Sequence, residues 1–138
     1  GVFGWAVSGE SSRLVARDSS AMGNESHNAL VELGGQLEMT RCLLTHHQKK
    51  HGCGLWVRNA GSTAVCEHST ISGAKYDNVY AFDFVHVTLR GCKCDASKEY
   101  GMHAGINATI AVDDSSTACS NKLGSKLEED GGRVVVCM

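Results

Sequence analysis

Short apolar segments separated by small turn residues recur along the whole chain. Residues 61–71, GSTAVCEHSTI, show the design: a Gly-Ser turn, then alternating apolar positions, then a Ser-x-Ile ending. Long apolar stripes with a 3.6-residue period are missing from the sequence. Alternation over a few residues is typical of a β-strand with one buried face. We therefore expect a chain made of short β-strands, with few helices.

The apolar positions repeat at nearly constant intervals along the sequence. The first column consists of Leu14, Leu37, Ala64, Val87, Ile110 and Val134, and only the interval between Leu37 and Ala64 is clearly longer than the others. Two positions further on, a second column is wholly apolar and consists of Ala16, Met39, Cys66, Leu89, Val112 and Val136. A steady period of roughly 23 residues predicts a stacked array of structural repeats.

Further columns keep the same register. Small residues come next, at Ser19, Cys42, Ser69, Cys92 and Ser115, and a third inward column follows at Ala21, Leu44, Ile71, Cys94 and Thr117. Seven positions before the first column, a second strand is expected around Val7, Leu30, Val57, Tyr80, His103 and Leu127. Alternating side chains and a stacking distance of ~4.8 Å allow such coils to wrap a narrow interior. The prediction is one all-β domain, 1–138, folded as a parallel β-solenoid of about six coils.

The repeat resembles the coil of right-handed parallel β-helix proteins with the pectate-lyase-like architecture. The Gly-Ser turn, the inward apolar pair and the Ser-x-Ile ending carry the resemblance, which extends over nearly the whole chain. It implies a right-handed parallel β-helix. The family includes lyases, hydrolases, epimerases, phage spikes and non-catalytic binding modules, so the resemblance implies no single activity. The leucine-rich repeat has a similar period, but its Leu-x-x-Leu-x-Leu pattern is not present here.

The outward positions around the first column form a candidate binding face. Its members are Val15, Arg17, Val65, Glu67, Thr88, Arg90, Ala111, Asp113 and Val135. In related enzymes the outward sheet carries a polysaccharide groove, so Glu67, Arg90 and Asp113, on three consecutive coils, are the catalytic candidates if this chain is a lyase or hydrolase. The same charges also fit a solvated ladder of ion pairs, which is the alternative we favour. The companion motifs Asn-Thr-Asp, Gly-His-Gly and Arg-x-Lys of polygalacturonase-like proteins are missing from the sequence.

The long interval between Leu37 and Ala64 places extra residues in the segment 45–54, THHQKKHGCG. An insertion in one repeat usually becomes a projecting loop. His46, His47, His51 and Cys53 are weak candidates for zinc or copper ligands, because imidazole and thiolate suit these metals. Their spacing matches no established motif, and a solvated basic loop is the simpler interpretation. No cofactor is expected.

The amino-acid composition indicates the type of turn, the classes of partner and the cellular compartment to expect. The 16 Gly and the lack of Pro favour turns with positive φ. A net charge of −2 gives no electrostatic reason to expect nucleic acid, and no apolar run reaches the length of a membrane span. Seven cysteines, four of them at the inward positions 42, 66, 92 and 94, favour free thiols and a reducing intracellular or organellar compartment over secretion.

The sequence therefore predicts a non-catalytic structural or protein-interaction module, a subunit of a larger assembly. Other protein subunits are the expected partners. They would contact the outward strand face and the C-terminal edge at Val134, Val135 and Val136, where the sequence stops inside an apolar strand with no cap after it. We expect this edge to be closed by a partner, by a second copy of the chain or by residues outside this sequence. The alternative is a carbohydrate-active β-helix that binds or cleaves an acidic polysaccharide.

Overall fold

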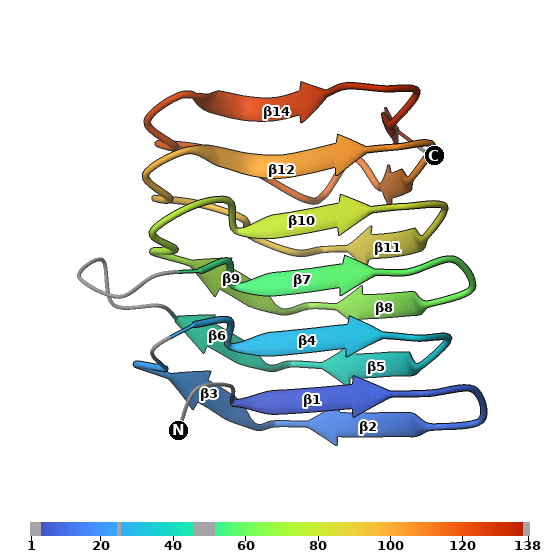
Figure 1. The fold of residues 1–138 in the computed structure, drawn as a ribbon. Helices are drawn as coiled ribbons and strands as arrows, with labels where there is room; N and C mark the ends of the chain where they lie inside the picture. The colour runs from blue at the N-terminus through green and yellow to red at the C-terminus, as the bar shows by residue number, and fades with distance from the viewer. Residues whose placement is uncertain (1–3, 25, 46–51, 137–138) are drawn as a thin grey trace.

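The computed structural model describes residues 4–24, 26–45 and 52–136. These residues form fifteen β-strands in three parallel sheets, and no helix occurs among them (Figure 1). Sheet A contains β1 (Trp5–Ser8), β4 (Ala29–Glu32), β7 (Leu55–Arg58), β10 (Val79–Phe82), β12 (Tyr100–Gly105) and β14 (Gly124–Glu128). Sheet B contains β2 (Arg13–Arg17), β5 (Gln36–Thr40), β8 (Thr63–Glu67), β11 (His86–Arg90), β13 (Thr109–Val112) and β15 (Arg133–Val136). Sheet C contains β3 (Ser20–Met22), β6 (Leu43–Thr45) and β9 (Thr70–Ser72).

The chain winds as a right-handed parallel β-helix. In Figure 1 the strands of sheet A cross the front from left to right, those of sheet B return behind them, and the chain climbs from the N-terminus upwards. Sheets A and B each contain six strands, one for each coil, so the chain makes about five full turns from the first strand to the last. The predicted fold class is confirmed. None of the described segments forms a helix able to cross a bilayer.

The interior is filled by the columns that the repeat predicts. Leu37 pairs in register with Ala64, and Val87 with Ile110, and all four are at most 1% exposed. Burial of an aliphatic side chain of this size contributes roughly 1.5–3 kcal/mol relative to exposure, so the stacked columns supply most of the driving force for folding. The four thiols at the inward positions are also buried and free, namely those of Cys42, Cys66, Cys92 and Cys94.

The expected column of the second strand is wrong by one residue in most coils. Val7 pairs with Val31 rather than with Leu30, and Val57 pairs with Ala81 rather than with Tyr80. The cause is the turn between sheets A and B, which is one residue longer in the first and third coils. In those coils the positive φ angles are separated by one residue, whereas in the other coils they fall on consecutive pairs: 33–34, 83–84, 106–107 and 130–131. A fixed seven-residue offset therefore mixes inward and outward positions.

A second correction concerns the fifth coil. The column alignment predicts that Thr117 points inward, but Thr117 is exposed, and Ala118 packs against the core in its place. Thr117 forms a β-bridge with Lys93, which lies one residue before the buried Cys94. Thr117 therefore takes the position of Lys93, and Ala118 takes the inward position of Cys94. One additional residue in the turn after β13 moves the register by one position.

Candidate functional site

The outer face of sheet A carries a column of rings. Tyr80 pairs in register with Trp56 on one side and with His103 on the other. The ring centroids of Trp56 and Tyr80 lie 5.9 Å apart at 64°, and those of Tyr80 and His103 lie 4.4 Å apart at 82°. Strands ~4.8 Å apart bring these rings into edge-to-face contact, an arrangement that aromatic rings favour. The rings consequently form angled walls on this face.

Further aromatic and cationic groups fix this column. His27 meets Trp56 with centroids 4.5 Å apart, and Phe82 stacks on Tyr80 at 5.9 Å. The Arg58 guanidinium lies 4.6 Å from the Trp56 ring centroid and forms an ion pair of 2.6 Å with Glu32. A guanidinium over an indole ring is a favourable cation–π contact. The indole therefore has little freedom to change its orientation.

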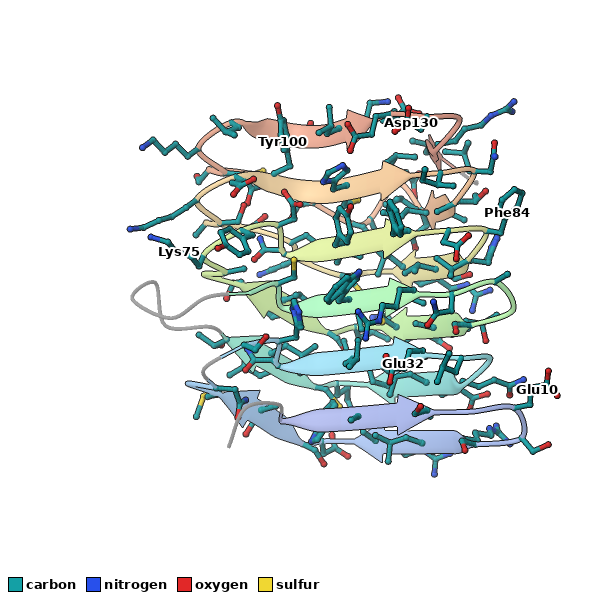
Figure 2. The ribbon with its side chains drawn as sticks, viewed as in Figure 1. Glu10, Glu32, Lys75, Phe84, Tyr100 and Asp130 are labelled. Carbon is teal, nitrogen blue, oxygen red and sulfur yellow. The ribbon has the colours of Figure 1, made fainter. Side chains whose placement is uncertain are left out.

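A pocket of about 470 Å³ opens beside these rings. Trp56, Tyr80 and His103 of its lining belong to β7, β10 and β12, and the other lining residues belong to the turns that precede strands of sheet A. Figure 2 looks onto this outer face, with the labelled Lys75 and Tyr100 near the ends where the strands begin. We call this the sheet A pocket, and it is lined by Ser26, His27, Gly52, Cys53, Trp56, Tyr76, Asp77, Tyr80, Glu99 and His103. Its volume falls within the range of small-molecule sites.

A chain of charged groups supports the pocket from one side. His103 Nδ1 lies 2.8 Å from Asp77 Oδ2, and His103 Nε2 lies 2.6 Å from Glu129 Oε1. Asp77 is only 3% exposed, and its Oδ1 accepts a hydrogen bond of 2.9 Å from the backbone N–H of Tyr100. Because both ring nitrogens of His103 face carboxylate oxygens, the imidazole is best satisfied when it carries both protons.

The same contacts shift the pKa of His103. Partial burial acts to lower this pKa, but the hydrogen bonds to Asp77 and Glu129 outweigh burial and raise it above the ordinary value. The two carboxylates thus favour the protonated form of the His103 ring. Neither ring nitrogen is open to a substrate, so in this arrangement His103 organises the pocket and does not exchange protons with a ligand.

The other titratable groups of the pocket experience a negative environment. Burial and the charge of Asp77 raise the pKa of Glu99, and burial and the charge of Glu129 raise that of Tyr80. Burial and the nearby Asp77 also raise the pKa of the Cys53 thiol far above its usual range. Cys53 therefore stays protonated, which makes it a poor nucleophile and a poor metal ligand.

The sequence-predicted binding face lies on the outside of sheet B. Its residues line two hollows: one of about 240 Å³ contains Val15, Arg17, Val65 and Glu67, and one of about 550 Å³ contains Thr88, Arg90, Ala111, Asp113 and Val135. Arg90 Nη1 lies 3.7 Å from Glu67 Oε1, and both side chains are about half exposed. The structure thus brings two of the three catalytic candidates together.

The carboxylate of Asp113, the third candidate, is engaged by hydrogen bonds within a turn and across to the neighbouring coil. Its carboxylate accepts hydrogen bonds of 3.0 Å from the N–H of Gly91, 2.8 Å from the hydroxyl of Ser116 and 2.9 Å from the hydroxyl of Ser115. The bond from Gly91 contributes most to lowering the pKa of Asp113 to about 2. A carboxylate that is so weakly basic and so fully engaged is poorly suited to general base catalysis.

Two other predictions concern the loop and the C-terminal edge. Among the described residues, no group of three or more His, Cys, Asp or Glu side chains could hold a metal ion, and His46, His47 and His51 lie outside those residues. In the described part of the chain β15 pairs only with β13. Val134 is buried, Val135 is half-buried and Val136 is 69% exposed.

Sequence reasoning missed the sheet A pocket although a signal for it exists. Trp56, Tyr80 and His103 follow each other at intervals that match the period of the repeat. The register error in the second strand hid this column, because it placed Tyr80 and His103 in the same column as Val57, whereas the structure pairs Tyr80 with Trp56. Comparison of the chain with protein-family models, with curated proteins and with solved structures found no match.

Proposed function

We propose that this protein is a non-catalytic β-helix module that binds a partner protein through the outer face of sheet A, as one subunit of a larger assembly. The single observation that carries the proposal is the sheet A pocket, in which aromatic walls and carboxylates meet on a solenoid face. Exposed aromatic groups around a concavity, with polar groups that fix orientation, are typical of binding surfaces.

The chemistry of the pocket favours binding over catalysis. The imidazole of His103 is engaged at both nitrogens, and the pKa of the Cys53 thiol is raised far above neutral pH. An activated nucleophile needs an available base beside it, and the described residues of the pocket contain no such pair. The groups that could react are instead used to hold the rings in place.

Photo-crosslinking tests this proposal. A benzoylphenylalanine would replace Tyr76, which is 39% exposed at the rim of the pocket, and in separate variants Val15 on sheet B or Phe84 in a turn. The expected result is a crosslinked partner, identified by mass spectrometry, from position 76 and none from position 84. Crosslinks from position 15 alone would move the interface to the predicted sheet B face. The proposal would be overturned if the protein is a monomer by light scattering and none of the three positions gives a crosslink.

A second candidate function is the binding or cleavage of an acidic polysaccharide on sheet B. The observation that favours it is the Glu67–Arg90 pair beside a hollow, since a guanidinium can bind a uronate carboxylate. A lyase would release an unsaturated product that absorbs ultraviolet light when the protein is incubated with polygalacturonate and calcium. Glu67→Gln should abolish that signal. An unchanged absorbance with the unmodified protein would exclude this activity on that substrate.

A further inference from the structure

We infer that the sheet A pocket is an aromatic cage for an organic ammonium group, in particular a methylated or quaternary amine. This inference deepens the proposed binding function and rests on it. Three properties of the described pocket residues support it: the angles between the rings, the excess of carboxylates, and the poor fit of the other ligand classes.

The rings form a corner and not a flat platform. Neighbouring planes in the column meet at 64° and 82°, so Trp56, Tyr80 and His103 present surfaces in different directions. A rounded cation gains attraction from the faces of Trp56 and Tyr80 that it approaches within about 6 Å, and indole is the best such partner. The charged ring of His103 does not attract the cation, but its edge-to-face contact fixes the orientation of Tyr80. Arg58 lies over Trp56 but does not line the pocket, so the guanidinium leaves the pocket side of the indole available.

The lining residues carry more negative than positive charge. Asp77 and Glu99 supply two carboxylates, and the imidazolium of His103 offsets only one of them. His27 is neutral, because its Nδ1 accepts a hydrogen bond of 3.0 Å from the backbone N–H of Cys53. No Lys or Arg is among the described residues that line the pocket. A positive ligand therefore completes the charge balance.

Glu99 is the carboxylate that a ligand would meet. Asp77 is already engaged, with one oxygen on the N–H of Tyr100 and the other on His103. The carboxylate of Glu99 forms no hydrogen bond or ion pair with another described residue. Partial burial and the negative charge of Asp77 raise its pKa. An ammonium group beside Glu99 would relieve that repulsion and lower the pKa of the carboxyl group.

Other ligand classes fit less well. An anion would meet two carboxylates without a facing Lys or Arg. A metal ion needs several oxygen or nitrogen ligands, and no suitable group exists among the described residues. A sugar ring stacks on a flat aromatic surface, whereas these rings stand at steep angles. A methylated ammonium combines a diffuse positive charge with an apolar surface, which matches both the rings and the carboxylate.

Nuclear magnetic resonance of the indole N–H groups tests the inference, because the chain has two tryptophans and only Trp56 lines the pocket. Choline would be titrated into the labelled protein at constant ionic strength, beside its neutral isostere 3,3-dimethylbutan-1-ol. We expect the Trp56 signal to shift with choline, with a millimolar or lower Kd, and the Trp5 signal to stay constant. Equal affinity for the neutral isostere, or an equal shift at Trp5, would overturn the cage.

Two substitutions test whether the carboxylate of Glu99 contributes to choline binding. Glu99→Gln should weaken choline binding about tenfold, whereas Glu67→Gln, the matched change on sheet B, should leave it unchanged. If Glu99→Gln fails to fold by circular dichroism, Tyr76→Leu at the rim provides the second variant, with a weaker binding expected. Equal affinities of the Glu99 and Glu67 variants would contradict the role of the pocket carboxylate.

Two sources of the ammonium group can be distinguished. A peptide with trimethyllysine that binds more tightly than choline and than its unmodified lysine form would identify a modified protein as the source. Choline that binds more tightly than the peptide would identify a free small molecule. If neither binds while the crosslink from position 76 persists, the cage is wrong and the interaction function stands. If choline binds and no crosslink forms, the protein-partner function is wrong and the cage stands.

Discussion

Sheets A and B are both six-stranded parallel sheets with the same strand spacing. Their outer faces differ in how stacking arranges the side chains. On sheet A, stacking brings Trp56, Tyr80 and His103 into ring contact and encloses Asp77, whose side chain is 5% exposed. On sheet B, stacking brings Glu67 beside Arg90, whose side chains stay 42% and 56% exposed. Bulky rings at one register position exclude water from their neighbours, whereas flexible charged chains leave water in place.

That difference in hydration separates the electrostatics of the two faces. Charges near water are screened, so exposed ion pairs contribute little to stability. Charges behind a wall of rings interact strongly, and removal of one partner leaves the other uncompensated. We therefore expect substitutions on sheet A to have larger effects than matched substitutions on sheet B. The following predictions test this comparison, from the largest effect to the smallest.

The largest effect is expected for Trp56→Ala. The indole contacts His27, Tyr80 and Arg58, and its truncation leaves a void beside the pocket. We expect a loss of about 3 kcal/mol in the free energy of unfolding, measured by urea denaturation. The matched change Val65→Ala on sheet B should cost about 1 kcal/mol or less, because Val65 is half-buried and small. Similar losses for both variants would show that the rings do not form a packed unit.

A somewhat smaller effect is expected for Asp77→Asn. The amide can still accept from the N–H of Tyr100, but the imidazolium of His103 loses its charged partner at Nδ1. The predicted loss is about 2 kcal/mol in the same denaturation experiment. Glu67→Gln, the control on sheet B, should change the free energy of unfolding by about 0.5 kcal/mol or less. A larger effect for the control would refute the contrast in screening.

The next prediction concerns the pH dependence of the sheet A network. The carboxylates raise the pKa of His103 above its ordinary value near 6.5, although burial opposes them. A group with a raised pKa in the folded state stabilises fully below its unfolded pKa and loses that contribution as the pH rises through the folded pKa. The stability advantage of the unmodified protein over His103→Gln should therefore shrink above neutral pH.

Nuclear magnetic resonance titration of the His103 ring measures this pKa directly. A midpoint above 6.5 is expected, and Asp77→Asn should lower it, because a negative neighbour is removed. A midpoint at or below 6.5 in the unmodified protein would mean that burial dominates over the two carboxylates. In that case His103 would be neutral near pH 7, and the net charge of the pocket would be more negative.

The inward columns of sheet B could be predicted from the sequence because they are specified by apolar identity alone. Leu37, Ala64 and Val87 repeat in register with their neighbouring columns, and the structure pairs them as expected. Sheet A was harder to predict, because its register relative to sheet B depends on turn length. One extra residue at Gly9–Ser11 or Asn59–Gly61 changes which side chains point outwards, and the composition of these turns does not reveal their length.

The candidate site was predictable only in part, for a related physical reason. Glu67 and Arg90 could be placed side by side because they belong to one strand position on adjacent coils. Asp113 occupies the next coil, but its carboxylate bonds backward to Gly91 and forward to two serines, which a column alignment does not indicate. The sheet A pocket also depends on Tyr76 and Glu99, which come from turns outside the repeat columns.

The smallest effect is expected at Asp113. Its pKa is lowered to about 2, first by the hydrogen bond from Gly91 and then by that from Ser116. A carboxyl group with a lowered folded pKa contributes stability above its unfolded pKa near 3.8, and this contribution is lost as the pH falls through about 2. Water screens this exposed turn, so Asp113→Asn should change stability at neutral pH less than either substitution on sheet A.

The amide resonance of Gly91 provides a specific readout for this last prediction, because its N–H donates to Asp113 Oδ1. We expect the Gly91 signal to titrate with a midpoint near 2 in the unmodified protein and to lose that titration in Asp113→Asn. A midpoint near 3.8 would mean that the turn does not hold the carboxylate, and Asp113 would regain its place beside Glu67 and Arg90 as a candidate base. A midpoint near 2, together with a His103 midpoint above 6.5, would show that local hydrogen bonds set the titration of Asp113 on sheet B and that the carboxylates of Asp77 and Glu129 set the titration of His103 on sheet A.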